Sequence, residues 1–356
     1  MRKAWENHIR KVVPYVPGEQ PKETNIIKLN TNENPYPPAP GVLQALKELD
    51  TELLRRYPDP AASELVNAIA EFYGLDAAQV FVGVGSDDVL AMAFLTCFNS
   101  RKPILFPDIT YSFYDVWADL FRIPYETQPL DSDFQIRTED YMRENGGIIF
   151  PNPNAPTGIL KPIDEIEEII RANTDVIVIV DEAYIDFGGK SAIPLLKTYD
   201  NLLIAQTFSK SRSLAGMRIG FLLGNPELIR YVNDCKYSFN SYTMSQAAIR
   251  LGTEAIRDRA YFGQCTKKLI ETREWAKVEF QKLGFTFADS MSNFVFVTHP
   301  DYAAEELFAA LKEKGIYVRH FKKPERIRNY LRITIGTREE MEALFACLKQ
   351  KIIIDR

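Results

Sequence analysis

The chain has 356 residues, of which 46% are apolar and 26% charged, a composition typical of a globular protein with ample core for two lobes. Its net charge of −5 argues against a nucleic-acid-binding surface, and its 4 cysteines and 3 histidines lack the spacing of zinc ligands, so we expect no metal. The charged N-terminus without a signal peptide and the absence of a membrane-length apolar run predict a cytoplasmic protein without a membrane segment.

The N-terminal region is rich in proline, and we expect residues 1–29 to form an irregular arm that packs on the body. The first clear helix is predicted at 63–73, because its apolar residues recur with helical spacing. Ser63 is expected to cap this helix, and Gly74 is expected to end it.

A glycine turn separates a predicted strand at 80–84 from a predicted helix at 87–98. Gly85 makes the turn, and Ser86 is expected to cap the helix, with Asp87 as its first residue. Free N–H groups and the helix dipole favour an anion at such a helix start. The sequence therefore predicts a phosphate site here.

Strands and helices alternate from there to Gly224, which predicts a doubly wound, mostly parallel sheet. Long helices follow, and the last of them, at 260–283, can bridge two lobes. The remaining segments predict a small α+β domain. We therefore expect a large domain over 30–258 and a small domain over 259–356, whose strands and helices are predicted at 285–288, 294–298, 303–314, 316–319, 330–335 and 338–351.

One lysine stands among hydroxyl residues and glycines in the run Thr-Phe-Ser-Lys-Ser-Arg-Ser-Leu-Ala-Gly-Met-Arg-Ile-Gly at 207–220. Lys210 could form a Schiff base with an aldehyde cofactor. Small hydroxyl side chains such as Ser209 can bind a phosphate, and Arg218 can hold it bidentately. Taken alone, Lys210 is better explained as a solvated lysine in a strand-to-helix turn, because most lysines are surface charges.

Two upstream motifs favour the cofactor interpretation. An apolar strand at 175–180 ends in Asp181, and open α/β sheets bind ligands at the carboxyl ends of their strands. Asp181 could keep a pyridine nitrogen protonated there, while Asn154 and Tyr184 could hydrogen-bond the ring's 3-oxygen. Together with Lys210, these side chains are the groups that a pyridoxal phosphate site needs.

The order of these motifs resembles that of the fold-type I pyridoxal phosphate aminotransferases. The run 207–220 is similar to the active-site signature of their histidinol-phosphate aminotransferase branch. One departure is Ala155, where many relatives have asparagine directly before Pro-Thr-Gly, so the group that contacts the 3-oxygen stays open. The other matching stretches are 14–18, 29–35, 56–59, 85–88 and 331–334.

The resemblance implies roles for individual residues. Lys210, Asp181 and Tyr184 would be catalytic, Tyr111 would stack on the pyridine ring, and Tyr57 would reach the cofactor phosphate of a neighbouring subunit in a homodimer. Tyr15, Asn32, Arg319 and Arg332 would bind substrate. The implied cofactor-binding residues are Tyr57, Gly85, Ser86, Asp87, Tyr111, Asn154, Asp181, Tyr184, Thr207, Ser209, Lys210 and Arg218.

The resemblance also implies the reaction, a transfer of the amino group of histidinol phosphate to 2-oxoglutarate in histidine biosynthesis, with glutamate as the second product. Arg332 would bind both the phosphate ester and the glutamate carboxylate, because a guanidinium can donate two parallel hydrogen bonds to either anion. Two alternatives share these motifs, an amino acid aminotransferase of aromatic or broad specificity and a threonine-phosphate decarboxylase.

Overall fold

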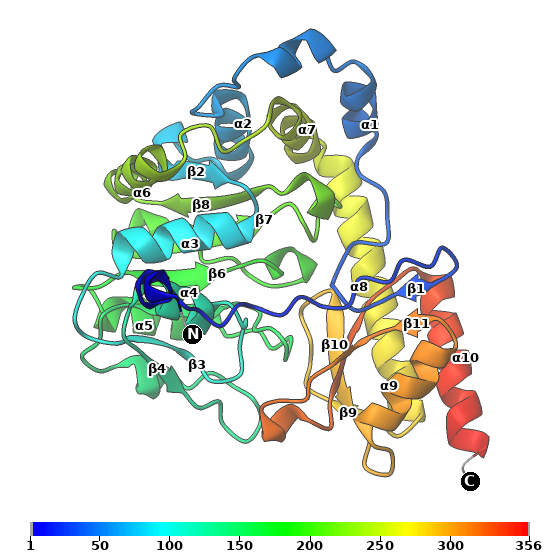
Figure 1. The fold of residues 1–356 in the computed structure, drawn as a ribbon. Coiled ribbons are helices and arrows are strands. Elements are labelled where there is room, and N and C mark those ends of the chain that lie inside the picture. Colours follow the sequence, from blue (N-terminus) through cyan, green and yellow to red (C-terminus); the bar gives the residue numbers. More distant parts are fainter. Residues whose placement is uncertain (1–2, 355–356) are drawn as a thin grey trace.

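A seven-stranded sheet in the order β2-β8-β7-β6-β5-β3-β4 dominates the computed structural model, which describes residues 3–354 (Figure 1). Neighbouring strands are parallel from β7 to β4, whereas β8 is antiparallel to both of its neighbours. The prediction of a mostly parallel sheet is confirmed. The strands are β2 (Val80–Gly83), β3 (Ile104–Pro107), β4 (Tyr125–Gln128), β5 (Ile148–Pro151), β6 (Val178–Asp181), β7 (Leu202–Thr207) and β8 (Gly220–Gly224).

Helices cover both faces of this sheet. In β6, Val178 and Val180 pack into one hydrophobic cluster, and Ile179 between them packs into another. Because successive strand residues point to opposite faces, a strand buried on both sides is apolar on both, as β6 is up to its last residue, Asp181. One face carries α3 (Ser86–Cys97), α4 (Tyr114–Phe121) and α6 (Pro226–Phe239), and the other carries α2 (Ser63–Tyr73), α5 (Ile163–Ala172) and α7 (Gln246–Arg257).

Two predicted helix caps are wrong. Ser63 and Ser86 are the first helical residues of α2 and α3, and neither side chain caps its helix. The caps are Ala62 and Gly85, whose φ angles are 48° and 87°. The serines therefore stand one position too late to accept the free N–H groups of the first turn. Gly74 ends α2 in the left-handed region, as predicted.

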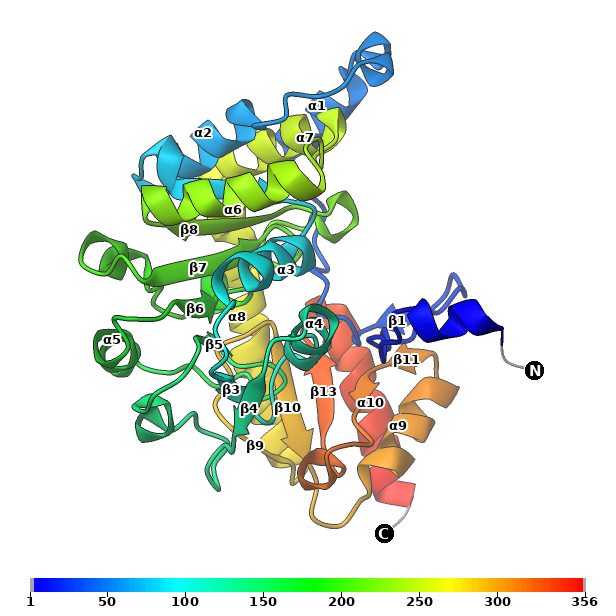
Figure 2. The same cartoon turned by 60° about the vertical axis from the view of Figure 1, so that its left-hand side comes forward.

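A second sheet has four strands in the order β12-β13-β10-β9, all antiparallel. Three helices pack around it, and the long α8 (Arg259–Lys282, yellow in Figures 1 and 2) runs beside both sheets. The other elements of this part are β9 (Thr286–Phe287), β10 (Phe294–Thr298), β12 (Arg319–His320), β13 (Leu331–Thr334), α9 (Ala304–Glu313) and α10 (Arg338–Ile354).

The strand predicted at 316–319 is in fact two. β11 (Ile316–Tyr317) pairs in parallel with β1 (Ile27–Lys28), and only β12 joins the four-stranded sheet. No local pattern indicates β1, because its partner lies in the opposite half of the chain. A short helix that was also not expected, α1 (Pro40–Lys47), packs on α7.

The N-terminal segment (dark blue) runs along the outside of the molecule, from the neighbourhood of α4 to β1 (Figures 1 and 2). Arg10 donates to the carbonyl of Leu120 at the end of α4, at 2.6 Å. Farther along, Lys312 of α9 binds the carboxylate of Glu19 at 2.7 Å. The division into 1–29, 30–258 and 259–356 stays a proposal, and residues 1–2 and 355–356 lie outside the described residues. Within 3–354, no helix is both long and apolar enough to cross a bilayer.

Candidate active site

The carboxyl ends of β6 and β7 open onto a cleft between the large sheet and the small one. Asp181 is the last residue of β6, and Lys210 follows β7 by three positions. The cleft has an inner end of about 160 Å³ and an outer end of about 250 Å³, and both are lined by Lys210, Tyr184 and Asp87. The sheet therefore places its ligand site where parallel α/β sheets generally do.

Asp181 lies at the bottom of the inner end and is only 4% exposed. The hydroxyl of Tyr114 donates to its Oδ2 at 2.9 Å, and the backbone N–H of Ala183 donates to its Oδ1 at 3.2 Å. Burial raises the pKa of Asp181 to about 6, against these hydrogen bonds, which lower it. A buried carboxylate in this setting gains from a cationic partner such as a protonated ring nitrogen.

Lys210 extends its amine into the cleft. Its Nζ donates to the carbonyl of Thr31 at 3.1 Å and lies 5.8 Å from the centre of the Tyr184 ring. The side chain of Asn34 donates to the carbonyls of Lys210 and Ser211 at 3.1 and 3.2 Å. The segment after β7 is thus fixed by residues 31–34, which lie far from it in the sequence.

A cradle for an anion forms where α3 begins. Gly85 has a φ of +87°, and a Cβ there would lie 2.5 Å from Nη2 of Arg218. Only glycine allows the guanidinium to come this close to the start of α3. Ser86, Ser209 and Arg218 all line the inner end of the cleft, so hydroxyl, guanidinium and helix start face one space.

Two other predicted residues, Thr207 and Asp87, hold the side chains of this cradle in place. Thr207 Oγ1 accepts the N–H of Ser209 at 3.1 Å and lies 3.0 Å from its Oγ, which orients that hydroxyl. Asp87 binds Arg218 at 3.1 Å and accepts from the hydroxyl of Tyr111 at 2.6 Å. Burial and the Asp87 carboxylate raise the pKa of Tyr111 well above its usual value, so this phenol keeps its proton.

Tyr184 and Asn32 form a pair in the cleft. The amide of Asn32 donates to the Tyr184 hydroxyl at 2.9 Å, which leaves the proton of that hydroxyl available to another acceptor. Asn32 has a φ of 57° and is 1% exposed. Its backbone N–H donates to Thr334 Oγ1 at 3.0 Å, and its carbonyl accepts from Asn293 at 2.9 Å.

Two predicted cofactor residues lie away from both the cleft and the cradle, whereas Gly85 and Thr207, which do not line the cleft either, belong to the cradle. Asn154 is 1% exposed, and its amide donates to the carbonyl of Ile109 at 3.0 Å and to Thr157 at 3.1 Å, while Ala155 lines the cleft instead. Tyr57 is 80% exposed and stacks on Tyr242 at 4.6 Å. The structure of one chain therefore brings neither of these side chains to Lys210.

Two arginines from the small sheet face the outer end of the cleft. The register of β12 and β13 sets Arg319 directly opposite Arg332. Arg332 donates from Nη2 to the carbonyl of Asn30 at 3.1 Å, but its buried Nε has no partner. Burial lowers the pKa of Arg332, with a further contribution from Arg319. Like charges opposite one another are destabilising, so this pair is suited to an anion between them.

Aromatic rings surround the same end. Tyr15 of the N-terminal segment stacks on Phe113 with ring centres 4.1 Å apart, and both residues line the outer end together with Phe321. The guanidinium of Arg319 lies 5.6 Å from the Phe321 ring. A flat side chain next to an anionic group would match this combination.

A model of the family described as aminotransferase class I and II matches residues 24–348. The chain belongs to this family. A histidinol-phosphate aminotransferase of Pseudomonas putida is 52% identical over 348 residues, covering 98% of this chain and 100% of that protein. One from Clostridium botulinum is 50% identical over 352 residues, covering 99% of both chains.

Solved structures share the fold of this aminotransferase. The histidinol-phosphate aminotransferase of Sinorhizobium meliloti in complex with pyridoxal-5'-phosphate has a TM-score of 0.83 at 24% identity, covering 93% of this chain and 92% of that chain. An L-threonine-O-3-phosphate decarboxylase from Porphyromonas gingivalis has a TM-score of 0.78 at 19% identity, covering 93% and 100%. The fold-type I prediction is confirmed, and at these identities the structures speak for the fold alone.

The structure also adds residues that the sequence did not single out. Tyr114 binds Asp181 from α4, Thr31 binds Lys210, and Phe113 and Phe321 line the outer end. Thr31 lies in a stretch that already carried the resemblance. For Tyr114 the signal was weaker, since an aromatic residue in an amphipathic helix ordinarily belongs to the core. Within residues 3–354, no group of three or more His, Cys, Asp or Glu side chains could hold a metal ion.

Proposed function

We propose that this aminotransferase catalyses pyridoxal phosphate-dependent amino transfer between L-histidinol phosphate and 2-oxoglutarate, which gives imidazole-acetol phosphate and glutamate in histidine biosynthesis. The relatives that are about half identical over the full chain support this reaction. The structural observation that carries it is the arginine pair, Arg319 opposite Arg332, beside an aromatic wall. Histidinol phosphate carries a phosphate ester where an amino acid carries its α-carboxylate, and its side chain is a flat imidazole ring, so it matches both features.

The residues of the inner end fit pyridoxal phosphate. The cofactor, when bound, supplies an electron sink for the bond that breaks at the substrate's Cα. Its phosphate would rest on the start of α3 with Ser209 and Arg218, and its pyridine nitrogen would meet Asp181. The free proton of the Tyr184 hydroxyl would serve the 3-oxygen, a role in which the amide of Asn154 is unavailable because the loop occupies it.

Lys210 would hold the cofactor, and its Nζ, once free, would serve as general base and then as general acid for the proton at the substrate's Cα. Asp181 would keep the ring nitrogen protonated, and its burial would strengthen that interaction. Tyr111 would stack on the ring. The second substrate, 2-oxoglutarate, would bind in the same site after the keto product has left, in a ping-pong cycle.

Arg332 would bind the anion of both substrates. Its unpartnered Nε and its Nη2 can donate two parallel hydrogen bonds, and they can do so to a phosphate or to a carboxylate equally well. Arg319 and Tyr15 would add contacts that only the larger phosphate dianion can use. Asn32 would position substrate indirectly, since it holds both Tyr184 and the segment that contacts Lys210.

The active unit would be a cytoplasmic homodimer in which Tyr57 reaches the neighbouring site. Support comes from large apolar side chains that this chain exposes at and beside Tyr57: Leu54 is 61% exposed, Tyr57 itself 80% and its stacking partner Tyr242 45%. Homodimers of Tyr57→Phe and Lys210→Ala can be mixed and allowed to exchange. If sites are shared, mixed dimers collect both lesions in one site and recover activity in the other, whereas a fully active monomer would contradict the proposal.

The reaction is tested with purified enzyme, 2-oxoglutarate and a panel of amino donors: histidinol phosphate, phenylalanine, tyrosine and aspartate. We expect kcat/KM to be highest for histidinol phosphate. A higher value for phenylalanine or tyrosine would favour the aromatic aminotransferase. Release of CO₂ from threonine phosphate would favour the decarboxylase, and either result would replace the proposed substrate.

A further inference from the structure

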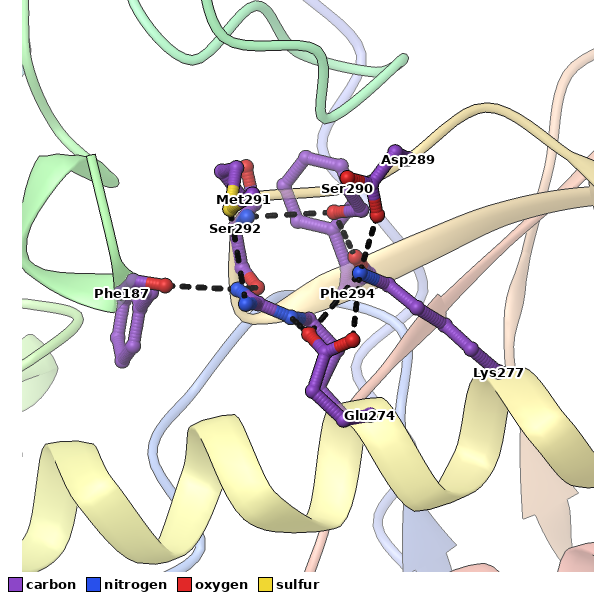
Figure 3. Close-up of polar contacts among 9 residues, drawn as sticks. Phe187, Glu274, Lys277, Asp289, Ser290, Met291, Ser292 and Phe294 are labelled. Carbon is purple, nitrogen blue, oxygen red and sulfur yellow. Dashed lines mark hydrogen bonds and ion pairs between the residues drawn. The ribbon is translucent and has the colours of Figure 1, made fainter.

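Arg273 is a buried charged residue, 2% exposed, that the proposed reaction does not use. Figure 3 labels its contact residues Phe187, Ser292 and Glu274. Arg273 lies on α8 and lines neither end of the cleft. Its Nη1 donates to two backbone carbonyls, that of Phe187 at 2.7 Å and that of Ser292 at 3.0 Å. Its Nε donates to Glu274 at 2.8 Å. A buried guanidinium with this many contacts fixes the spacing of the two carbonyls.

One of these carbonyls belongs to the turn that carries Tyr184. Phe187 ends the 3₁₀ helix Ile185–Phe187, and its N–H donates to the Tyr184 carbonyl at 3.2 Å. Phe187 is 1% exposed, so this turn packs as part of the core. Displacement of the Phe187 carbonyl would therefore move the backbone of Tyr184.

The other carbonyl belongs to the connection between β9 and β10, residues 288–293. Ser292 precedes Asn293, whose amide donates to the Asn32 carbonyl at 2.9 Å. Asn32 in turn donates to the Tyr184 hydroxyl at 2.9 Å. The contacts thus close a ring, from Arg273 through Tyr184 and Asn32 to Asn293 and back to Arg273.

The same connection also abuts the loop that lines the cleft at Ala155. The N–H of Met291 donates to the Gly158 carbonyl at 2.9 Å. A Cβ at Gly158, whose φ is +80°, would lie 2.3 Å from Ser290 Oγ. There is no room here for the connection to shift without moving the cleft wall.

We propose that Arg273 is a positioning residue for the reaction: it sets where the Tyr184 hydroxyl and the Asn32 amide stand relative to Lys210. This inference deepens the proposed function and rests on it for the role of Tyr184. A purely stabilising Arg273 would lower the melting temperature when replaced. A positioning Arg273 must in addition weaken the cofactor contact made by Tyr184, and that effect must vanish when Tyr184 has lost its hydroxyl.

The test is a double-mutant cycle of Arg273→Met and Tyr184→Phe, read as the dissociation constant of pyridoxal phosphate titrated by absorbance into the cofactor-free enzyme. This readout needs no amino substrate, so a wrong choice of substrate leaves it intact. Each single variant should weaken binding by about 10-fold, the worth of one hydrogen bond to a charged group. In the Tyr184→Phe background, Arg273→Met should change binding by less than about 3-fold.

Lys277→Met is the matched control, because it removes a buried cation one turn farther along α8. Lys277 is 7% exposed and binds only carboxylates, Glu274 at 2.9 Å and Asp289 at 2.6 Å (Figure 3). It should lower the melting temperature and leave the dissociation constant within about 2-fold of the parent in both backgrounds.

Equal effects of Arg273→Met in the two backgrounds would overturn the proposal, and so would an effect that Lys277→Met reproduces. Arg273→Lys should restore part of the affinity, since an ammonium can still reach one carbonyl but lacks the fork. If Arg273→Met does not fold, Asn293→Ala opens the same ring at its other end. The double-mutant cycle of Asn293→Ala with Tyr184→Phe then tests the proposal. Coupled effects on the dissociation constant of pyridoxal phosphate support it, and additive effects contradict it.

Discussion

The two ends of the cleft are built in opposite ways. At the cofactor end, the side chains already bind one another: Asp181 accepts from Tyr114, and Arg218 binds Asp87. At the anion end, Arg332 has a buried Nε without a partner, and Arg319 stands directly opposite it. The polar side chains of the cofactor end have partners within the protein, whereas the charges of the two arginines at the anion end are compensated only when an anion binds.

This difference follows from where the residues come from. The cofactor end is formed mainly by the ends of strands in one sheet, so the fold of that sheet positions it. The anion end combines the N-terminal segment at Tyr15, the stretch around Asn32 and two strands of the small sheet. A site of the first kind suits a permanently bound cofactor. A site of the second kind suits substrates that must enter and leave in every cycle.

The largest effect is expected at the cofactor end, from Lys210→Ala. Removal of the amine deletes both the attachment point and the general base, so turnover should fall by at least about 10³-fold. Borohydride should fix the cofactor covalently to the parent enzyme but not to the variant, as peptide mass analysis would show. Reduced cofactor on another lysine of the parent would refute the assignment.

Asp181→Asn tests whether this end supplies charge as well as shape. Asparagine can keep the contact with the Ala183 N–H but cannot hold the ring nitrogen protonated. We expect kcat to fall by roughly 10²- to 10³-fold, typical for removal of a preorganised electrostatic partner. Cofactor should still bind, which absorbance titration can follow. A near-normal kcat would show that Asp181 has only a structural role.

Arg332→Ala tests the anion end, with an effect shared by two substrates. Loss of a charge-assisted bidentate contact should cost on the order of 2–4 kcal/mol, or roughly 30- to 1,000-fold in kcat/KM, for histidinol phosphate and for glutamate alike. Arg332→Lys should recover only part, because a point charge cannot reproduce the fork. Damage to one half-reaction alone would mean that each anion has its own site.

Arg319→Ala sharpens the same comparison. This substitution removes the like charge opposite Arg332. For glutamate, which carries one carboxylate beside the reacting carbon, the lost attraction to Arg319 and the relieved repulsion between the two arginines should nearly cancel in kcat/KM. Histidinol phosphate should lose about 10-fold in kcat/KM, since a dianion gains more from two cations. Steady-state kinetics on both substrates separates the outcomes. A larger loss for glutamate would contradict a role of Arg319 in reading the phosphate.

Most residues of the cofactor end could be predicted from the sequence, because they lie in short motifs at the ends of neighbouring strands. Asp181 ends an apolar strand, and Lys210, Ser209 and Arg218 lie in one short run, so the rule for parallel sheets brings them together. The exceptions within one chain are Tyr57, which lies away from the cleft, and Asn154. Its residue type fitted a contact with the cofactor, but the loop consumes its amide in contacts with Ile109 and Thr157.

The arginines of the anion end could be identified from the sequence, but their arrangement in space could not be predicted. Arg332 and Arg319 stood out as charges in apolar strands, yet their register depends on the pairing of β12 with β13. That pairing, like the parallel pairing of β1 with β11, joins segments whose partners no local pattern specifies. The ring around Arg273 could not be predicted for the same reason, because the contacts that close it join residues distant in sequence.

The last prediction concerns the stability of the fold behind the cofactor end and not the rate of the reaction. Glu182 follows Asp181, is 1% exposed, and accepts from Ser191 and the Ala192 N–H at 2.6 Å and from Gln206 at 2.9 Å. Burial raises its pKa from 4.5 to about 7. Because the folded pKa lies above the unfolded one, protonated Glu182 favours the folded state. This contribution is fully present below about pH 4.5 and is lost as the pH rises through 7.

Glu182→Gln should remove this dependence on pH. Between pH 5 and pH 8, the free energy of unfolding of the cofactor-free parent should fall by about 2 kcal/mol more than that of the variant, as urea titrations at the two pH values would measure. Glu168→Gln, at an exposed position on α5, is the control and should parallel the parent. If Glu182→Gln also parallels the parent, the carboxylate is stabilised by its three donors as fully as water stabilises it. The cofactor end would then rest on a permanently charged residue, in the same manner as the arginine pair at the anion end.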